Sequence, residues 1–187
     1  MVNTFLFMGR PGSGKGAQSK LLAQKLGCKV FSTGGHMREI AKRDSFFGRK
    51  IKEIVDSGGL TPYWFASFVF EEILFSLEGN EKVVFEGIGR KEAEARLFTE
   101  ISEWLGRDFI VIYLDVSEKT IIERLKKRRL KEGRVDDNNV QNRLNNYNTD
   151  TIHAIDFFRS IGKVIDIDGE PSPDAIANLI WEKLSVL

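Results

Sequence analysis

Cysteine and histidine are scarce in this chain, which has one cysteine and two histidines among 187 residues. Cys28 cannot form a disulfide within the chain, and the Cys and His residues are too few for a structural zinc site. The sequence therefore excludes a disulfide-stabilised scaffold and a zinc finger. Proline is also scarce, with four residues, and there is no Pro- or Ser-rich linker, low-complexity tail or internal repeat. We expect one folding unit.

An excess of charge of one sign is missing too, because 28 Lys and Arg residues stand against 27 Asp and Glu residues. This balance argues against a generic nucleic-acid or membrane-surface binder. No uncharged run reaches the ~18 residues that a membrane span requires, and the apolar residues 1–8 have neither a basic flank nor a small-residue cleavage pattern. We expect a cytoplasmic domain whose core needs no disulfide or structural metal.

Short β-branched or aromatic runs alternate with longer segments whose apolar residues recur every three or four positions. This alternation is typical of βαβ units around a parallel sheet. We therefore predict an α/β fold with a five-stranded parallel sheet and helices on both faces. The predicted strands are Val2–Met8, Lys29–Phe31, Lys82–Phe85, Phe109–Leu114 and Lys163–Ile167.

Two helix starts carry a capping signal. Thr61 followed by Pro62 predicts a helix with a threonine cap and proline at its first position. Ser172 followed by Pro173 predicts the start of the last helix in the same way. A further helix is predicted over residues 91–104.

The most specific local signal is Gly9-Arg10-Pro11-Gly12-Ser13-Gly14-Lys15, between the first predicted strand and an apolar-periodic helix. This is the phosphate-loop spacing in its strand–loop–helix context. Backbone N–H groups of such a loop turn inward on an anion, and Lys15 reaches the β- and γ-phosphates. Gly16 stands where most such loops have the Ser or Thr that binds Mg²⁺ directly. We expect no direct metal ligand, with Mg²⁺ held through water by Glu86, unless Glu86 is an ordinary strand-end acid.

A basic run extends from Arg124 to Arg134, where seven of eleven residues are Lys or Arg. Such a run is usually a solvated helix end, and an RNA-binding patch and a phosphate clamp are the sharper alternatives. Arg124 and Arg128 are four residues apart, so they project from the same face of a helix. Two guanidinium groups on one face suit bidentate binding to phosphate.

These motifs resemble the adenylate kinase family of nucleoside monophosphate kinases nearly from end to end. Residues 9–18 are similar to the family's phosphate loop, residues 58–62 to the turn against the acceptor base, and residues 85–90 to its Phe-Asp-Gly-Phe-Pro-Arg segment. Residues 134–137 with Arg143 resemble the hinge and closing helix of its lid. The resemblance implies a three-layer phosphate-loop kinase fold in one domain over residues 1–187. It also implies an acceptor-binding flap at residues 33–60 and a very short lid at residues 129–136.

The activity implied by the resemblance is reversible transfer of the γ-phosphoryl group of ATP to AMP, with Mg²⁺ as cofactor. The implied partners are the nucleotides ATP and AMP, without nucleic acid or membrane, and the implied state is a monomer. Transfer between two nucleotide phosphates needs no general base; it needs alignment, charge neutralisation and exclusion of water.

The site residues that the resemblance implies fall into three groups. The catalytic group is Lys15, Arg90, Arg128, Arg134 and Arg143. The ATP-binding group is Gly12, Ser13, Gly14, Lys15, Gly16, Ala17, Arg124, Arg128 and Gly169. The acceptor-binding group is Thr33, Arg38, Gly59, Leu60, Thr61, Gly87, Arg90, Glu94, Arg134 and Arg143.

Glu94 departs from the family pattern, which has a glutamine at this position. Glutamine can donate to adenine N1 and accept from the amino group, whereas an ionised glutamate only accepts. A preference for GMP, CMP or UMP therefore stays open beside AMP, as does a catalytically weak nucleotide-binding homologue. Alternatively, Glu94 is an exposed helix residue and another side chain contacts the base. Two other function classes are disfavoured. A kinase for a hydroxylated metabolite needs only one phosphate clamp, so the many arginines speak against it. A nucleotide-dependent switch needs a direct Mg²⁺ ligand, and Gly16 removes that ligand.

Overall fold

The computed structural model describes residues 1–132 and 139–186. Within these residues, the chain forms a five-stranded sheet in the order β2-β3-β1-β4-β5, with every neighbouring pair parallel. The strands are β1 (Thr4–Gly9), β2 (Lys29–Ser32), β3 (Val83–Glu86), β4 (Phe109–Asp115) and β5 (Val164–Asp168). Each predicted strand is present with its ends displaced by at most two residues, so the predicted α/β fold is confirmed.

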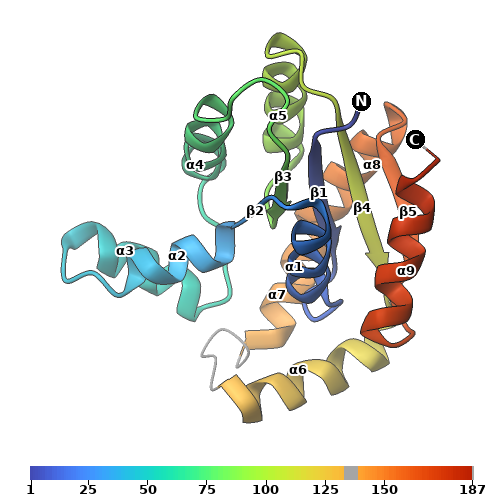
Figure 1. Cartoon of the computed structure of the whole chain (residues 1–187). Helices are drawn as coiled ribbons and strands as arrows, with labels where there is room; N and C mark the ends of the chain where they lie inside the picture. Colours follow the sequence, from blue (N-terminus) through green and yellow to red (C-terminus); the bar gives the residue numbers. More distant parts are fainter. Residues whose placement is uncertain (133–138, 187) are drawn as a thin grey trace.

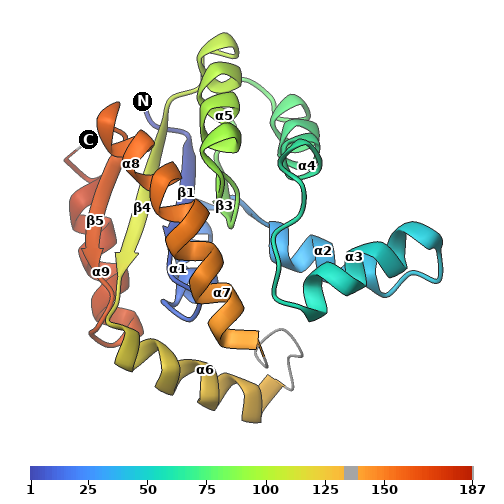
Figure 2. The ribbon, with the colours of Figure 1, turned by 180° about the vertical axis from the view of Figure 1, so that it is seen from behind.

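Helices cover both faces of the sheet (Figures 1 and 2). One face is covered by α1 (Lys15–Leu26) and α9 (Pro173–Leu184), and the other by α4 (Tyr63–Phe75), α5 (Glu92–Trp104) and α8 (Ile152–Ser160). α6 (Glu118–Glu132) runs below the carboxyl ends of the strands and is followed by α7 (Val140–Asn146) and the π-helical turn η2 (Tyr147–Thr151). No helix in the described ranges is long and apolar enough to cross a membrane.

The larger core lies between the sheet and the helices α4, α5 and α8. Its centre is a group of phenylalanines that meet edge to face, with Phe98 of α5 against Phe70, Phe85 and Phe109 at ring-centroid distances of 5.5, 6.1 and 5.1 Å. Rings in this arrangement gain electrostatic attraction beyond the area that they bury. This packing fixes the position of α5. The segment that leads into the first turn of α5 forms part of the wall of a cavity.

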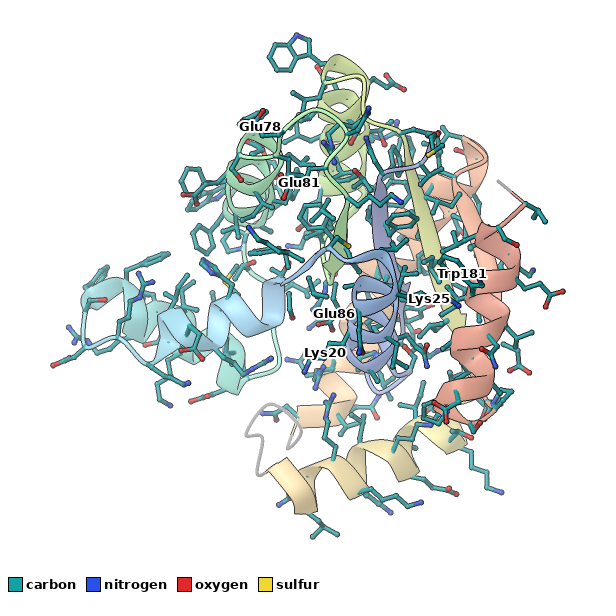
Figure 3. The ribbon with its side chains drawn as sticks, in the orientation of Figure 1. Lys20, Lys25, Glu78, Glu81, Glu86 and Trp181 are labelled. Atoms are coloured by element: carbon teal, nitrogen blue, oxygen red, sulfur yellow. The ribbon has the colours of Figure 1, made fainter. Side chains whose placement is uncertain are left out.

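A second core holds α1 and α9 against the opposite face of the sheet. Leu22 and Ala23 of α1 and Ile176 and Ile180 of α9 are buried there against the strands. At the rim, the Lys25 ammonium lies 4.0 Å from the centre of the Trp181 ring (Figure 3). The helix that follows the phosphate loop is therefore fixed along its length.

The helices α2 (Thr33–Ala41) and α3 (Phe46–Asp56) form an arm that projects from the β2 side of the sheet (Figure 1). This α2–α3 arm has its own apolar cluster, in which Met37, Ile40 and Ile51 pack on Phe65 and Val69 of α4. Serine caps begin both helices: Ser32 Oγ accepts from the Gly35 N–H, and Ser45 Oγ accepts from the Gly48 N–H. The arm is thus a small unit anchored on α4.

One of the two predicted caps is present and the other is wrong. Ser172 Oγ accepts from the Ala175 N–H, and Pro173 is the first residue of α9, as predicted. α4 instead begins at Tyr63, with Pro62 in the capping position and no side-chain cap. The backbone at Pro62 is extended, with ψ of 140°, so Thr61 lies one residue too early to cap the helix.

Phe98→Ala should lower the free energy of unfolding by about 3–5 kcal/mol, because it leaves a cavity among three other rings. Urea unfolding measures the change. The matched control is Phe75→Ala, since Phe75 is 56% exposed while Phe98 is fully buried. We expect the control to cost less than about 1 kcal/mol. Equal losses in the two variants would contradict the assignment of Phe98 to the core.

Candidate functional site

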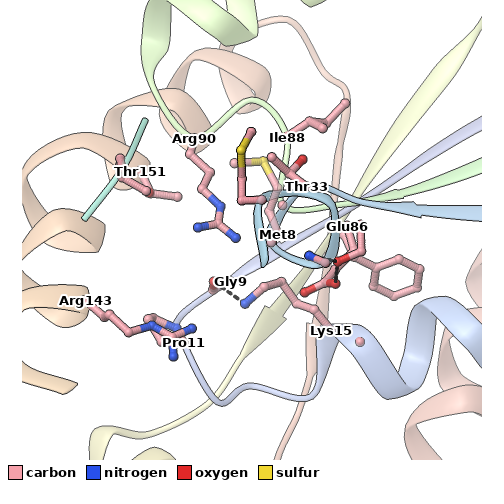
Figure 4. Close-up of a pocket in the computed structure, with 18 of the residues that line it drawn as sticks. Met8, Gly9, Pro11, Lys15, Thr33, Glu86, Ile88, Arg90, Arg143 and Thr151 are labelled. Carbon is pink, nitrogen blue, oxygen red and sulfur yellow. Dashed lines mark hydrogen bonds between the residues drawn. The ribbon is translucent and has the colours of Figure 1, made fainter. Parts of the chain in front are cut away.

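A cavity of about 730 Å³ lies at the carboxyl ends of the strands, where ligands bind in open parallel sheets. The last residues of β1, β2 and β3, which are Gly9, Ser32 and Glu86, line it. The other walls include the phosphate loop, α1, the α2–α3 arm and residues 58–61 after it, α4, the segment between β3 and α5, α6, α7 and η2 (Figure 4). The cavity is the point where all of these elements meet.

The phosphate loop forms one wall in a conformation that requires glycine. Gly9 has a φ of +139°, and a Cβ there would lie 2.6 Å from the Leu114 carbonyl oxygen. Gly12 has a φ of +85°, and a Cβ there would lie 2.9 Å from Leu125 of α6. Gly14 is left-handed and precedes α1 directly, so the N-terminus of that helix faces the cavity. The loop thus presents backbone N–H groups to an anion.

Lys15 lies in the middle of the cavity wall. Its ammonium donates to the carbonyl oxygens of Gly9 at 2.8 Å and Arg10 at 2.7 Å (Figure 4). Burial lowers the pKa of Lys15 to about 7, although the nearby Glu86 raises it and the neighbouring arginines lower it further. An anion bound beside it would favour the charged form, so the lysine is suited to a phosphate ligand.

Glu86 lies opposite the phosphate loop. Its Oε2 accepts from the Ser32 hydroxyl at 2.6 Å. Burial opposes ionisation, but the Ser32 hydrogen bond and the charges of Lys15 and the arginines outweigh it, so the pKa of Glu86 lies below its ordinary value. A Cβ at Gly16 would be 3.8 Å from Glu86 Oε2. The space that a Ser or Thr of the loop would fill therefore opens onto an ionised carboxylate.

The donor set fits a hydrated magnesium ion better than a metal held by the protein alone. In the part of the chain that the structure describes, no three His, Cys, Asp or Glu side chains gather to hold a metal ion. A single ionised carboxylate beside a phosphate loop suits Mg²⁺, which keeps several waters and binds substrate phosphates. Glu86 is the residue in that position.

Arginines from four segments converge with Lys15. The arginines that line the cavity are Arg38 from α2, Arg90 before α5, Arg128 from α6 and Arg143 from α7. Figure 4 shows Arg90, Arg143 and Lys15 directed toward the same space. Gly87, with a φ of +84°, permits the position of Arg90, because a Cβ would lie 2.5 Å from its Nη2. Arg134 was expected in this group and lies outside the described residues.

The expected ATP-side residues divide into a lining group and a supporting group. Gly14, Lys15, Gly16, Ala17 and Arg128 line the cavity, whereas Gly12, Ser13, Arg124 and Gly169 lie beside it. Arg124 donates to the carbonyl oxygens of Ser13 at 3.4 Å and Gly169 at 2.9 Å. It therefore joins the phosphate loop to the segment after β5.

The expected acceptor-side residues also line the cavity, and we call the part that they line its acceptor end. Those that line it are Thr33, Arg38, Gly59, Leu60, Thr61, Gly87, Arg90, Glu94 and Arg143. The Thr33 hydroxyl is buried without a hydrogen-bond partner among the described residues. Met37, Val55 and Ile88 line the cavity as well, so this end combines apolar surface with a few polar groups.

Glu94 is buried in this wall, with 3% of its surface exposed, so the alternative of an exposed helix residue is wrong. Its Oε2 accepts from the Arg90 backbone N–H at 2.9 Å. Burial raises the pKa of Glu94 to about 6, against the opposing effects of Arg90 and Lys91. The carboxyl is therefore closer to its neutral form than an exposed glutamate.

Sequence reasoning missed two residues that support the site. Ser32 caps α2 and holds Glu86, and a serine just before a predicted helix is a recognisable capping signal. Arg10 donates to the Val116 carbonyl oxygen at 3.2 Å and lies 5.2 Å from the centre of the Tyr147 ring. No local pattern marks this second contact, because Arg10 and Tyr147 are far apart in the chain.

Comparison with known proteins gives concordant results. The family model for adenylate kinase matches residues 7–163. An adenylate kinase of Leptospira biflexa is 32% identical over 186 residues, covering 98% of this chain and 100% of that protein. An adenylate kinase of Phocaeicola vulgatus is 34% identical over 94% of both chains. Adenylate kinase isoenzyme 1 of Caenorhabditis elegans is 34% identical over 98% of this chain and 88% of that protein.

Glu94→Gln should stabilise the protein at high pH and not at low pH. The folded-state pKa is raised, so ionisation of Glu94 costs stability, a cost that is absent below about pH 4.5 and complete above about pH 6. A rise of this size corresponds to about 2 kcal/mol, while glutamine still accepts from the Arg90 N–H. Urea unfolding at pH 8 and pH 4.5 measures the difference.

Glu103→Gln is the control for this experiment, because Glu103 is an exposed carboxylate on the same helix. We expect it to change the free energy of unfolding by less than about 0.5 kcal/mol at either pH. A gain from Glu94→Gln that is as large at pH 4.5 as at pH 8 would contradict the proposed effect of ionisation.

Proposed function

The chain belongs to the adenylate kinase family, and from this membership we propose that its cavity transfers the γ-phosphoryl group of ATP to AMP, reversibly, to give two ADP. The chain is a nucleoside monophosphate kinase, a phosphotransferase. The observation that carries the proposal is the convergence of Lys15, Arg38, Arg90, Arg128 and Arg143 on one cavity at a phosphate loop. A kinase for a hydroxylated metabolite has no need of so many cations.

Charge neutralisation and alignment account for the chemistry. The attacking atom is an oxygen of the AMP phosphate, which is already an anion, so no base is required. We assign Lys15 and the N-terminus of α1 to the β- and γ-phosphates of ATP, and Arg38 and Arg90 to the phosphate of AMP. Arg128 and Arg143 then neutralise the group in transfer. Fixed donors of this kind contribute about 10²–10³-fold each to catalysis.

Mg²⁺ bound to ATP would neutralise phosphate charge during transfer. Glu86 would hold the ion through its water molecules, because the carboxylate is ionised and faces Gly16 of the phosphate loop. Ser32 keeps this carboxylate in place. No other carboxylate is assigned to the ion.

The acceptor site is assigned to the α2–α3 arm, which corresponds to the flap expected at residues 33–60. The adenine of AMP would lie among Gly59, Leu60 and Glu94, with the Thr33 hydroxyl near its phosphate. The short lid expected at residues 129–136 would carry Arg134. The monomeric state that the family resemblance implies is kept as part of this proposal.

Glu94 fits AMP in its protonated form. The neutral carboxyl can donate its O–H to adenine N1, as glutamine would, and its other oxygen can accept. Since the pKa of Glu94 is raised to about 6, this form is accessible near neutral pH. AMP recognition at this position is therefore tied to a proton.

We expect AMP to be phosphorylated faster than GMP, CMP, UMP or dTMP when each is offered with ATP and Mg²⁺. Product formation against a blank without acceptor measures this directly. The KM for AMP should rise between pH 6 and pH 8, because Glu94 loses its donor. Glu94→Gln, which cannot titrate, should remove that part of the pH dependence. Faster turnover of GMP or CMP would contradict the assignment of AMP.

Arg90→Ala should lower kcat/KM for AMP by about 10²–10³-fold, because it removes a cation from the acceptor phosphate. Arg96→Ala is the matched control, since Arg96 is exposed on α5 and pairs with Glu92 at 2.7 Å. We expect the control to stay within about twofold. Unchanged turnover in Arg90→Ala would favour a catalytically silent homologue.

A further inference from the structure

Three asparagines at α7 bind the end of α3. Asn139 Nδ2 donates to the Asp56 carbonyl oxygen at 2.6 Å, and Asn142 Nδ2 donates to that of Ser57 at 2.6 Å. Asn146 Nδ2 donates to the Gly58 carbonyl oxygen at 3.1 Å. We call Asn139, Asn142 and Asn146 the asparagine clasp. Its three donors meet three consecutive carbonyl groups.

The spacing of the clasp residues follows the helix. Positions 139, 142 and 146 are separated by three and four residues, so their side chains share one face of α7. Asn145 has a different role, since its Oδ1 accepts from Gln141 Nε2 at 3.0 Å. α7 thus carries asparagines that contact the end of α3, and it also carries Asn145, which does not.

The carbonyl groups of Asp56 and Ser57 lie at the end of α3, and that of Gly58 lies just beyond it. The last carbonyl groups of a helix have no partner within it. Those of residues 53, 54 and 55 accept from the backbone N–H groups of Ser57, Gly59 and Gly58, respectively. Those of residues 56, 57 and 58 accept from the clasp. The amide donors also lie at the negative end of the helix dipole.

Gly58 allows the close contact between the arm and α7. A Cβ at Gly58 would lie 2.9 Å from Arg143 Cγ and 3.3 Å from Asn139 Cβ, and its φ is +69°. The next residues, Gly59 and Leu60, line the acceptor end of the cavity, as does Arg143. The clasp is therefore continuous with two parts of the acceptor wall.

We propose that the asparagine clasp positions the acceptor site by holding the α2–α3 arm closed against α7. This inference rests on the proposed function, in which the arm binds AMP. Asn139 and Asn142 act through the Gly58–Leu60 turn and through Arg143, because they do not line the cavity, whereas Asn146 also lines it. Each protein hydrogen bond replaces bonds to water, so each shifts the closing equilibrium by only about a few-fold to tenfold. The arm can reopen to release product.

The double variant Asn139→Ala, Asn142→Ala tests the proposal by steady-state kinetics, because neither residue lines the cavity. We expect the KM for AMP to rise by roughly 10- to 100-fold, since two hydrogen bonds are lost. The KM for ATP should stay within about twofold, and kcat at saturating AMP within about threefold. Asn145→Ala, on the same helix, should change none of these values. An equal rise in KM for ATP, or an unchanged KM for AMP, would overturn the proposal.

An isosteric variant separates donation from packing. Asn142→Asp keeps the size of the side chain but replaces the donor by an acceptor that faces the Ser57 carbonyl oxygen. If the donor matters, Asn142→Asp raises the KM for AMP at least as much as Asn142→Ala does. Normal kinetics in Asn142→Asp would show that shape alone is required, and would overturn the clasp.

Hydrogen exchange of the nucleotide-free protein tests the contact without relying on activity. We expect faster deuterium uptake over residues 46–60 in the double variant, and no change in the strands or in Asn145→Ala. Unchanged uptake over these residues would overturn the proposal. A wild-type protein that makes no ADP from AMP, yet shows the expected exchange, would refute the proposed function and leave the contact between the arm and α7 intact.

Discussion

Mutual repulsion among the cations of one cavity is the constraint on which the rest of the structure depends. Lys15, Arg38, Arg90, Arg128 and Arg143 face a common space, and the fold must hold them there before any phosphate arrives. Two backbone carbonyl groups and the ionised Glu86 offset part of this charge. Burial lowers the pKa of Lys15 to about 7, and the remaining charge of the neighbouring arginines lowers it further. The site is thus arranged to be stable with two bound polyanions rather than without a ligand.

The fold meets this constraint by drawing the cations from different elements. Parallel strands end at the same edge of the sheet, and the helices that follow β1, β2 and β3 begin beside the cavity. The phenylalanines around Phe98 fix α5, which begins just after Arg90. The second core fixes α1, which carries Lys15. Each of these five cations comes from a different segment of the chain, so each is supported by the packing of its own segment.

Much of this could be predicted from sequence, and the failures have physical causes. The strands were identifiable because strands covered on both faces are continuous apolar runs, and the phosphate loop because its glycines have a fixed spacing. The cap at Thr61 was wrong because Pro62 itself takes the capping position. Burial of Glu94 depends on which side of α5 packs on the sheet, which spacing alone does not give. The clasp pairs Asn139 with Asp56, far apart in sequence, and no local pattern encodes it.

The small apolar cluster of the α2–α3 arm has a consequence for how such a molecule can change. Met37, Ile40 and Ile51 pack with each other and on α4, and Phe31 of β2 packs against them, so the arm carries a small core of its own at the edge of the sheet. The segment that contacts the acceptor can therefore change in sequence with little change in the rest of the fold. Substitutions in this segment and in its contact with α7 could adapt the site to a different acceptor, while the residues that bind the donor stay unchanged.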